Sequence, residues 1–240
     1  MELIFTAASN QKYAQIASDL GYLYGARLPA KIYPEFTPHF VDQNWKRPDL
    51  YPKYRAAVAD HKPHLASVLD WEHENQLAEV LRWAEEIAPS VQEIIVIPKV
   101  PGQVHKIPSI IGGKKVRLGF SVPTSHGTTE VMLDEIEAHG AGVHLLGGDP
   151  RTQMMITARL GAQVKSIDFN KVMRMASLNC VWVAQPLPKG KAVNRKWPQL
   201  QDLGLGHLTE DTCYTAFAMS MENIGKAWKS GAVQGQIPMF

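Results

Sequence analysis

The stretch VHLLGGDPRTQMMITARLGAQVKSIDFN, residues 143–170, decides the predicted fold. Its apolar start and the two glycines that follow predict a buried strand that ends in a turn. Asp149 and Pro150 then suit the N-cap and first position of a helix, which continues to a glycine stop at Gly161. A second short strand follows and contains Asp168. The stretch therefore predicts a strand–helix–strand unit with polar residues at the carboxyl ends of its strands.

Apolar segments with strand character also precede this unit, and most alternate with segments of helical periodicity. With the two strands above they make eight candidates, the number that closes a (β/α)8 barrel. A doubly wound open sheet is the rival, but it usually carries a glycine-rich turn after the first strand, where this chain has AASNQ. We predict one domain over residues 1–240, an α/β fold with a TIM-type barrel over about 1–172 and a helical, basic extension over about 173–240. The preceding strand candidates are residues 3–8, 22–28, 39–42, 64–70, 93–99 and 116–122.

Composition excludes several classes of protein. The 240 residues have a formal net charge of +2 and are 45% hydrophobic, as in an ordinary soluble domain. No apolar run reaches the roughly 20 residues of a membrane span, and no basic n-region marks a signal peptide, so we expect a cytoplasmic protein. Cys180 and Cys213 form no CxxC pair, and the nine histidines show no HExxH spacing. We therefore expect no disulfide framework, no catalytic metal and no cofactor.

Three of the predicted strands end on an aspartate, namely Asp42, Asp70 and Asp168. Each of them alone has a structural alternative, as the cap of a helix or turn. Together, beside a Gly-Gly turn, they predict a pocket lined by carboxylates at the carboxyl end of the barrel. Such a pocket suits nucleophilic displacement at an anomeric carbon, or recognition of N–H donors on a purine-like edge. Both roles occur together in a base-exchanging glycosyltransferase.

A family resemblance rests on two segments of the chain. HLLGGDPRTQMMITARLGAQVKSIDFN resembles the last barrel unit of the tRNA-guanine transglycosylase superfamily, and ASVLDWEHENQLAEVLRWAEEI is similar to the segment that recognises the base there. The resemblance implies that Asp168 is the nucleophile, that Asp70 binds guanine and that Asp42, in FVDQNW, is the general acid and base. It places four further residues against the base: Lys99, Gly119, Gly147 and Gly148. Asn170, beside the nucleophile, is a candidate for orienting it or binding a ribose hydroxyl, or simply starts a turn.

The chain departs from the transfer-RNA enzymes of this superfamily, which carry a CxCxxC-and-His zinc site after the nucleophile strand. In this respect it looks more like the shorter, zinc-free DNA 7-deazaguanine transglycosylase (DpdA-type) branch of phages and some bacteria. The resemblance then implies DNA as partner and a preQ0-like 7-deazaguanine base as co-substrate. Two alternatives remain open: a zinc-free transfer-RNA enzyme, and a non-catalytic nucleic-acid-binding barrel whose carboxylates are caps. A small-molecule glycosidase on the same barrel is a further, less favoured alternative.

Basic and aromatic residues extend the nucleic-acid hypothesis. Basic side chains in the extension are candidates for phosphate contacts, with a solvated surface loop as the alternative. Aromatic side chains near the barrel rim are candidates for base stacking, although each would more commonly be packed against the barrel. The basic candidates are Lys189, Lys191, Arg195 and Lys196, helped by Lys46, Arg47, Lys114 and Lys115. The aromatic candidates are Trp45, Trp71, Phe120 and Phe169, and we expect His126 and His144 to be structural.

Overall fold

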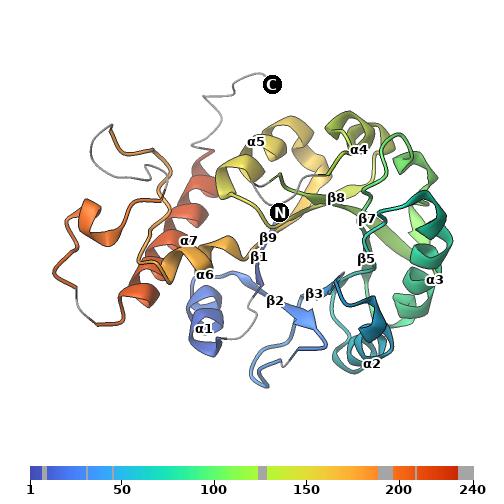
Figure 1. Ribbon diagram of the computed structural model, residues 1–240, viewed down its shortest axis with the longest axis horizontal. Helices are drawn as coiled ribbons and strands as arrows, with labels where there is room; N and C mark the ends of the chain where they lie inside the picture. The colour runs from blue at the N-terminus through green and yellow to red at the C-terminus, as the bar shows by residue number, and fades with distance from the viewer. Residues whose placement is uncertain are drawn as a thin grey trace.

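The protein is a closed parallel β-barrel surrounded by helices (Figure 1). The computed structural model describes residues 1–6, 10–30, 32–44, 46–123, 129–188, 197–208 and 210–231. Neighbouring strands pair in parallel around the ring, and the pairing of β5 with β7 closes it. The predicted TIM-type (β/α)8 barrel is therefore confirmed. Its eight strands are β1 (Glu2–Thr6), β2 (Leu23–Leu28), β3 (Phe40–Gln43), β4 (Leu65–Ser67), β5 (Glu93–Val96), β7 (Lys114–Ser121), β8 (Gly142–Leu146) and β9 (Val164–Phe169).

Helices cover the outside of the barrel (Figure 1). The described part of residues 29–39, between β2 and β3, holds no helix, and residues 97–113 hold only the turn Val104–Lys106 and the short strand β6 (Ile110–Ile111). No helix in the described ranges has both the length and the apolar composition needed to cross a membrane. The helices are α1 (Gln11–Asp19), α2 (Tyr51–His61), α3 (Leu77–Ile87), α4 (Leu133–His139), α5 (Pro150–Leu160), α6 (Lys171–Ala176) and α7 (Thr212–Ser230).

Local capping signals explain where the helices begin. The Asp149 side chain accepts a hydrogen bond from the backbone N–H of Arg151 at 3.1 Å, and Pro150 occupies the first turn of α5. At the start of α1, Asn10 accepts from the backbone N–H groups of the second and third helical residues. These side chains satisfy backbone donors that have no partner within the helix. Because such signals are local, the sequence predicts the start of α5 at Pro150 correctly.

The interior of the barrel consists of an apolar layer between two polar ends. Residues on each strand alternate between the barrel interior and the surrounding helices, as the pleat requires. The apolar layer is a small buried cluster, separate from the larger core between strands and helices, made of Ile4, Phe40, Leu65, Ile95 and Ile97. The interior positions two residues later on the same strands include Thr6, Asp42 and Ser67, at the carboxyl end. This alternation places the predicted catalytic carboxylates inside the mouth of the barrel.

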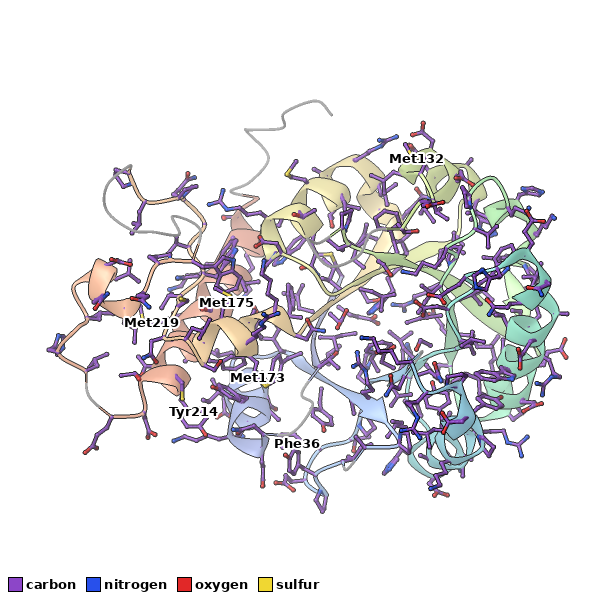
Figure 2. The ribbon with its side chains drawn as sticks, in the orientation of Figure 1. Phe36, Met132, Met173, Met175, Tyr214 and Met219 are labelled. Atoms are coloured by element: carbon purple, nitrogen blue, oxygen red, sulfur yellow. The ribbon has the colours of Figure 1, made fainter. Side chains whose placement is uncertain are left out.

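The C-terminal helices pack directly on the barrel. Phe217 of α7 is fully buried, with its ring 4.9 Å from that of Phe5 on β1 and 4.7 Å from that of Tyr13 on α1. Tyr22 donates a hydrogen bond to the backbone carbonyl of Met221 in α7. Figure 2 shows this region, where α6 and α7 add four partly buried side chains to the core: Met173, Met175, Tyr214 and Met219. The extension therefore completes the helical layer over the first and last strands.

Candidate active site

Asp168 lies inside the carboxyl end of the barrel, on β9, and only 5% of it is exposed. One carboxylate oxygen accepts a hydrogen bond from the backbone N–H of Gly147 at 2.6 Å. The other accepts from the Thr6 hydroxyl, at the end of the neighbouring strand β1, at 3.1 Å. Two donors from different strands therefore fix the position of this carboxylate.

The Gly-Gly turn after β8 is built to present this N–H group. Gly147 and Gly148 have φ values of 56° and 83°, which side chains disfavour. A Cβ on Gly148 would also lie 2.5 Å from the Val122 side chain. The buried Gln153 of α5 donates to the carbonyl of Gly147 at 2.6 Å and to that of Asp168 at 2.9 Å. Gln153 thus ties the turn to the strand that bears the carboxylate.

The environment of Asp168 opposes its ionisation. Burial raises the pKa of Asp168 to about 7, and the hydrogen bond from Gly147 limits the rise. The negative charge of Asp42 raises this pKa further, while Thr6 and Arg27 lower it. The carboxyl group therefore changes its charge near neutral pH, and strongly shifted pKa values of this kind are common at functional sites.

Asp42 is the second carboxylate of the barrel mouth, on β3. Its Oδ1 accepts from the buried Ser67 hydroxyl at 2.9 Å, and its Oδ2 lies 3.2 Å from the guanidinium of Arg27. Burial raises the pKa of Asp42, and the charge of Arg27 and the hydrogen bond from Ser67 oppose this rise. Asp42 raises the pKa of Asp70 as well as that of Asp168, so its charge acts on both other carboxyl groups.

Asp70 and Lys99 form the third part of the mouth, beyond the strand ends. The sequence extends the fourth and fifth strands to these residues, but β4 ends at Ser67 and β5 at Val96. The two segments still run side by side, which leaves Lys99 Nζ 3.7 Å from Asp70 Oδ2 and hydrogen-bonded to Ser121. Burial raises the pKa of Asp70 to about 7, and the charge of Lys99 opposes this rise. The predicted pairing of these residues in one site is consistent with this contact.

Two other predicted substrate residues, Asn170 and Gly119, lie in different surroundings. Asn170, which is exposed, lies beside Gly147, because a Cβ on that glycine would be 3.7 Å from the Asn170 side chain. Gly119 faces the packed barrel interior, where a Cβ would lie 2.6 Å from Ile97 and 2.9 Å from Ile95. The absence of a side chain at Gly119 therefore has a packing reason.

His144, on β8, extends the site below Asp168 and was expected only as a structural histidine. Its Nδ1 lies 2.7 Å from the Ser166 hydroxyl, which accepts from Arg117 Nη1 at 2.9 Å. Because Arg117 can only donate, the Ser166 hydrogen is free to point at Nδ1, an arrangement that would put the imidazole proton on Nε2. That Nε2 has no hydrogen-bond partner among the described residues and is 3.8 Å from Asp168 Oδ1. Burial lowers the pKa of His144 to about 3, and the Arg117 charge adds to this, so the ring is neutral.

The polar supports of the carboxylates carry no sequence motif. Each is a single residue within an apolar strand or helix, and its role depends on contacts with distant segments. Only the period of two along the strands, which places a polar residue on the inner face, gives a signal in the sequence. The supports that sequence reasoning missed are Thr6, Arg27, Ser67, Gln153 and Ser166.

The basic candidates separate into groups. Lys114 and Lys115 begin β7, so they lie at the amino end of the barrel, and the expectation that they lie near the carboxyl ends of strands is wrong. Arg47 follows β3 and pairs with Asp49 at 2.8 Å. Trp197, which follows the basic run, donates its indole N–H to Asp149 at 3.0 Å, on the turn beside the site. The run itself lies outside the described residues: Lys189, Lys191, Arg195 and Lys196.

The aromatic candidates for base stacking are packed into the core. Trp71 is fully buried, and its indole N–H donates to the backbone carbonyl of His73 at 2.9 Å. Phe120 and Phe169 are 5% and 1% exposed. The structural alternative therefore holds for these three side chains, while Trp45 and His126 lie outside the described ranges.

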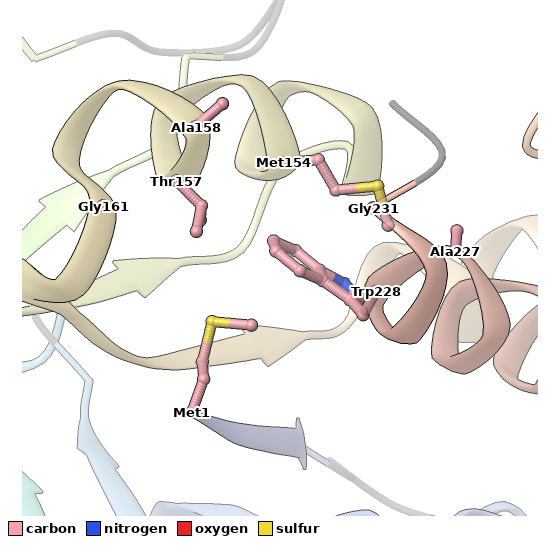
Figure 3. A pocket seen from close by; sticks show the side chains of 8 residues that line it. All are labelled: Met1, Met154, Thr157, Ala158, Gly161, Ala227, Trp228 and Gly231. Atoms are coloured by element: carbon pink, nitrogen blue, oxygen red, sulfur yellow. The ribbon is translucent and has the colours of Figure 1, made fainter. Parts of the chain in front are cut away.

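A hollow of about 330 Å³ lies away from the carboxylates, between α5, the end of α7 and the start of β1 (Figure 3). Trp228 points into it from α7, facing Met1 and Thr157. Its lining side chains contain no acid, base or thiol. The hollow therefore offers no group for catalysis, and the carboxylates remain the better candidate site.

The arrangement at the carboxyl end of the barrel suits proton transfer and nucleophilic attack. Two buried carboxyl groups, Asp70 and Asp168, share one mouth with the largely buried Asp42, and among the described residues Lys99 and Arg27 are their counter-charges. No curated protein matches the chain. A family model described as a family of unknown function (DUF6610) matches residues 17–229, and that description assigns no activity. Since this match covers most of the sequence, the chain belongs to the DUF6610 family.

Proposed function

We propose that this protein is a DNA-guanine transglycosylase, which exchanges guanine in DNA for a preQ0-like 7-deazaguanine base. The observation that carries the proposal is the Asp168 carboxylate at the mouth of a closed barrel. It is buried, it is held by Gly147 N–H and Thr6, and its pKa is raised to about 7. The resemblance of residues 144–170 to the nucleophile unit of the transglycosylase superfamily supports the assignment of this carboxylate as the attacking group.

The shared charge of the three carboxyl groups supports a division of roles. Because Asp42 raises the pKa of both Asp70 and Asp168, the three groups do not all ionise near neutral pH. In the state that the proposed reaction uses, Asp42 holds the proton and its charge no longer raises the pKa of Asp168, so the mouth holds an ionised Asp168 and a protonated Asp42. A nucleophile and a general acid are the two groups that displacement at an anomeric carbon requires.

In the first half of the proposed reaction, guanine leaves the DNA. The target nucleotide must first leave the base stack, at a cost of a few kcal/mol. An Asp168 oxygen then forms a bond to C1′, while the C1′–N9 bond breaks and its electron pair departs with the base. Asp42 gives its proton to that base. The product is a glycosyl ester on Asp168 and free guanine.

In the second half, the 7-deazaguanine replaces guanine. Asp42, now ionised, takes the proton from the ring nitrogen of the incoming base, which attacks C1′ and releases the Asp168 carboxylate. Asp70 accepts hydrogen bonds from the N–H groups of the base, as a carboxylate can. Lys99, whose Nζ lies 3.7 Å from Asp70 Oδ2, partly neutralises the negative charge of Asp70 when no base is bound. The Gly147–Gly148 backbone lies under the base.

The choice of DNA rests on two features. The chain lacks the cysteine pattern of the zinc-containing transfer-RNA enzymes. In addition, the basic run of the extension is followed by Trp197, which is anchored on Asp149 beside the site. Lysines and arginines so close in sequence to Trp197 are the residue types that contact nucleic-acid phosphates.

Base exchange on two substrates tests this proposal. Duplex DNA and transfer RNA, each containing labelled guanine, are incubated with the protein and preQ0, and both the released guanine and the modified nucleosides are measured by mass spectrometry. We expect exchange in DNA, and a covalent protein–DNA adduct that survives denaturation. Asp168→Asn should abolish both. Asp60→Asn, an exposed substitution on α2, serves as the matched control and should retain both.

Three outcomes would overturn the proposal. Full base exchange by Asp168→Asn would show that Asp168 is not the nucleophile. Exchange in transfer RNA alone would favour the transfer-RNA alternative. Binding of DNA with no base released, unchanged by loss of both Asp42 and Asp168, would identify a non-catalytic barrel.

A further inference from the structure

A second cluster of titratable side chains lies at the amino end of the barrel, opposite Asp168. Glu2 begins β1, His39 directly precedes β3 and His64 directly precedes β4. Each offers one ligand atom, a carboxylate oxygen or an imidazole nitrogen, and these three atoms lie within 4.8 Å of one another. Residues far apart in the sequence therefore bring two imidazoles and a carboxylate together at the ends of nearby strands.

The geometry of this cluster fits shared ligands of one metal ion. His39 Nε2 is 3.5 Å from Glu2 Oε1 and makes no hydrogen bond in the described part of the chain. Two ligands of a tetrahedral zinc ion, each about 2.0–2.2 Å from the metal, are roughly 3.4 Å apart. The rings of His39 and His64 stack at 4.8 Å between centroids, with an interplanar angle of 16°. The three ligand atoms, within 4.8 Å of one another, can reach one ion once the side chains rotate toward it.

The surroundings hold the ligands in place. Arg117 Nη1 donates to Glu2 Oε2 at 2.6 Å, which orients the carboxylate and leaves Oε1 facing His39. Ligands that are oriented by such outer contacts bind metals more tightly. The histidine backbones are fixed by the strands, since His39 donates to Tyr24 and the carbonyl of His64 accepts from the N–H groups of residues 92 and 93.

Charge and access also favour a cation. The carboxylates of Glu2 and Glu93 both bind the single guanidinium of Arg117, so with neutral imidazoles the cluster has a net charge of about −1. The Glu2 and His39 side chains are 26% and 21% exposed, which leaves a path from solvent. A divalent ion here gains a negatively charged site and displaces only the long 3.5 Å contact of Arg117 with Glu2 Oε1, while the 2.6 Å contact with Oε2 stays in place.

We propose that Glu2, His39 and His64 bind a divalent transition-metal ion of the zinc class, with water as a further ligand. Two imidazoles and a carboxylate suit zinc and its neighbours, whereas magnesium and calcium prefer oxygen ligands alone. The ion joins the amino ends of β1, β3 and β4, and its role is structural because the reacting carboxylates lie at the other end. The inference is independent of the proposed base exchange. The absence of a spacing motif in the sequence reflects a site assembled from three separate strand starts.

Metal binding by the untagged, chelator-treated protein tests the proposal. Zinc is titrated by calorimetry, thermal unfolding is followed with and without zinc, and cobalt serves as a spectroscopic probe of the coordination. The wild type should bind one zinc ion per chain and unfold at a higher temperature with zinc, but not with magnesium. His39→Gln and His64→Gln should each weaken zinc binding by about tenfold or more and remove the rise in Tm. His105→Gln, an exposed histidine elsewhere, is the matched control and should behave as the wild type.

Each other outcome overturns the proposal. If the wild type binds no zinc, the contact between His39 and Glu2 is an ion pair only. If the two variants bind zinc as tightly as the wild type, the metal lies elsewhere, for example on the thiols of Cys180 or Cys213. Circular dichroism and gel filtration of the metal-free variants show whether they fold, and His64→Gln, at a half-exposed position, is the variant least disruptive to the barrel.

Discussion

Asp168→Asn should make the protein more stable at alkaline pH, although it removes the proposed nucleophile. Asparagine has the shape of aspartate, so its oxygen still accepts from Gly147 and its amide still meets the Thr6 hydroxyl. The substitution therefore removes the charge and leaves the packing almost unchanged. The substitution removes the free-energy cost of keeping residue 168 ionised in the buried barrel mouth beside Asp42.

The magnitude follows from the difference between the folded and unfolded states. The pKa of Asp168 is about 7 in the folded protein and about 3.9 in an unfolded chain. A raised carboxyl pKa has no cost below the unfolded value, and the cost grows with pH until the folded value is passed. Its limit is about 4 kcal/mol, at about 1.4 kcal/mol per pKa unit. Between pH 5 and pH 8 the stability of the variant relative to wild type should therefore rise by about 2 to 3 kcal/mol.

Urea unfolding of both proteins at pH 5, 6, 7 and 8 measures this difference, because subtraction cancels every other titrating group that the two share. Asp149→Asn is the control with the opposite sign. Despite its burial, hydrogen bonds from Trp197 and Lys171 and the charge of Lys171 lower the pKa of Asp149. Its loss should destabilise the protein by an amount that is constant from pH 5 to pH 8. A constant or falling difference for Asp168→Asn over the same range would refute the raised pKa, and with it the balance of charges in the mouth.

Three further substitutions test the supports of the site by urea unfolding. Gln153→Ala removes both hydrogen bonds that tie the turn to β9 and should cost about 2 to 4 kcal/mol; a cost under 1 kcal/mol would show that the turn holds itself. Gly148→Ala should cost about 2 kcal/mol more than Gly140→Ala, since both glycines have positive φ but only the first meets a side chain, that of Val122; equal costs would contradict this clash. Trp197→Phe loses the hydrogen bond to the N-cap carboxylate and should cost about 1 kcal/mol, with no change in m-value; a changed m-value would indicate that the extension detaches.

The sequence predicts the barrel well because its signals are local. The helix predicted to begin at Pro150 ends in the structure at Leu160, one residue before the predicted glycine stop. Strands that are buried on both faces appear as short apolar runs between such helices. Parallel topology then places every carboxyl end on one face, which is why Asp42, Asp70 and Asp168 could be assigned to one site before their contacts were known.

The sequence does not predict the features that depend on where each strand begins and ends or on contacts between distant segments. The strand predicted over residues 64–70 is shorter in the structure, where β4 ends at Ser67. Val68 and Leu69 beyond it are also buried, so the apolar pattern does not mark the strand end. Lys114 and Lys115 lie at the wrong end for the proposed ligand because the strand begins, rather than ends, with them. Polar residues inside different strands come into contact only when the barrel closes, so the sequence does not predict which of them interact.

The polar interior explains how Asp168 keeps a raised pKa next to a histidine. An imidazolium 3.8 Å away would favour the carboxylate and lower its pKa. Burial and the charge of Arg117 prevent this by keeping His144 neutral, while the Ser166 hydroxyl lies 2.7 Å from its Nδ1. The neutral ring therefore does not offset the burial that raises the pKa of Asp168 to about 7.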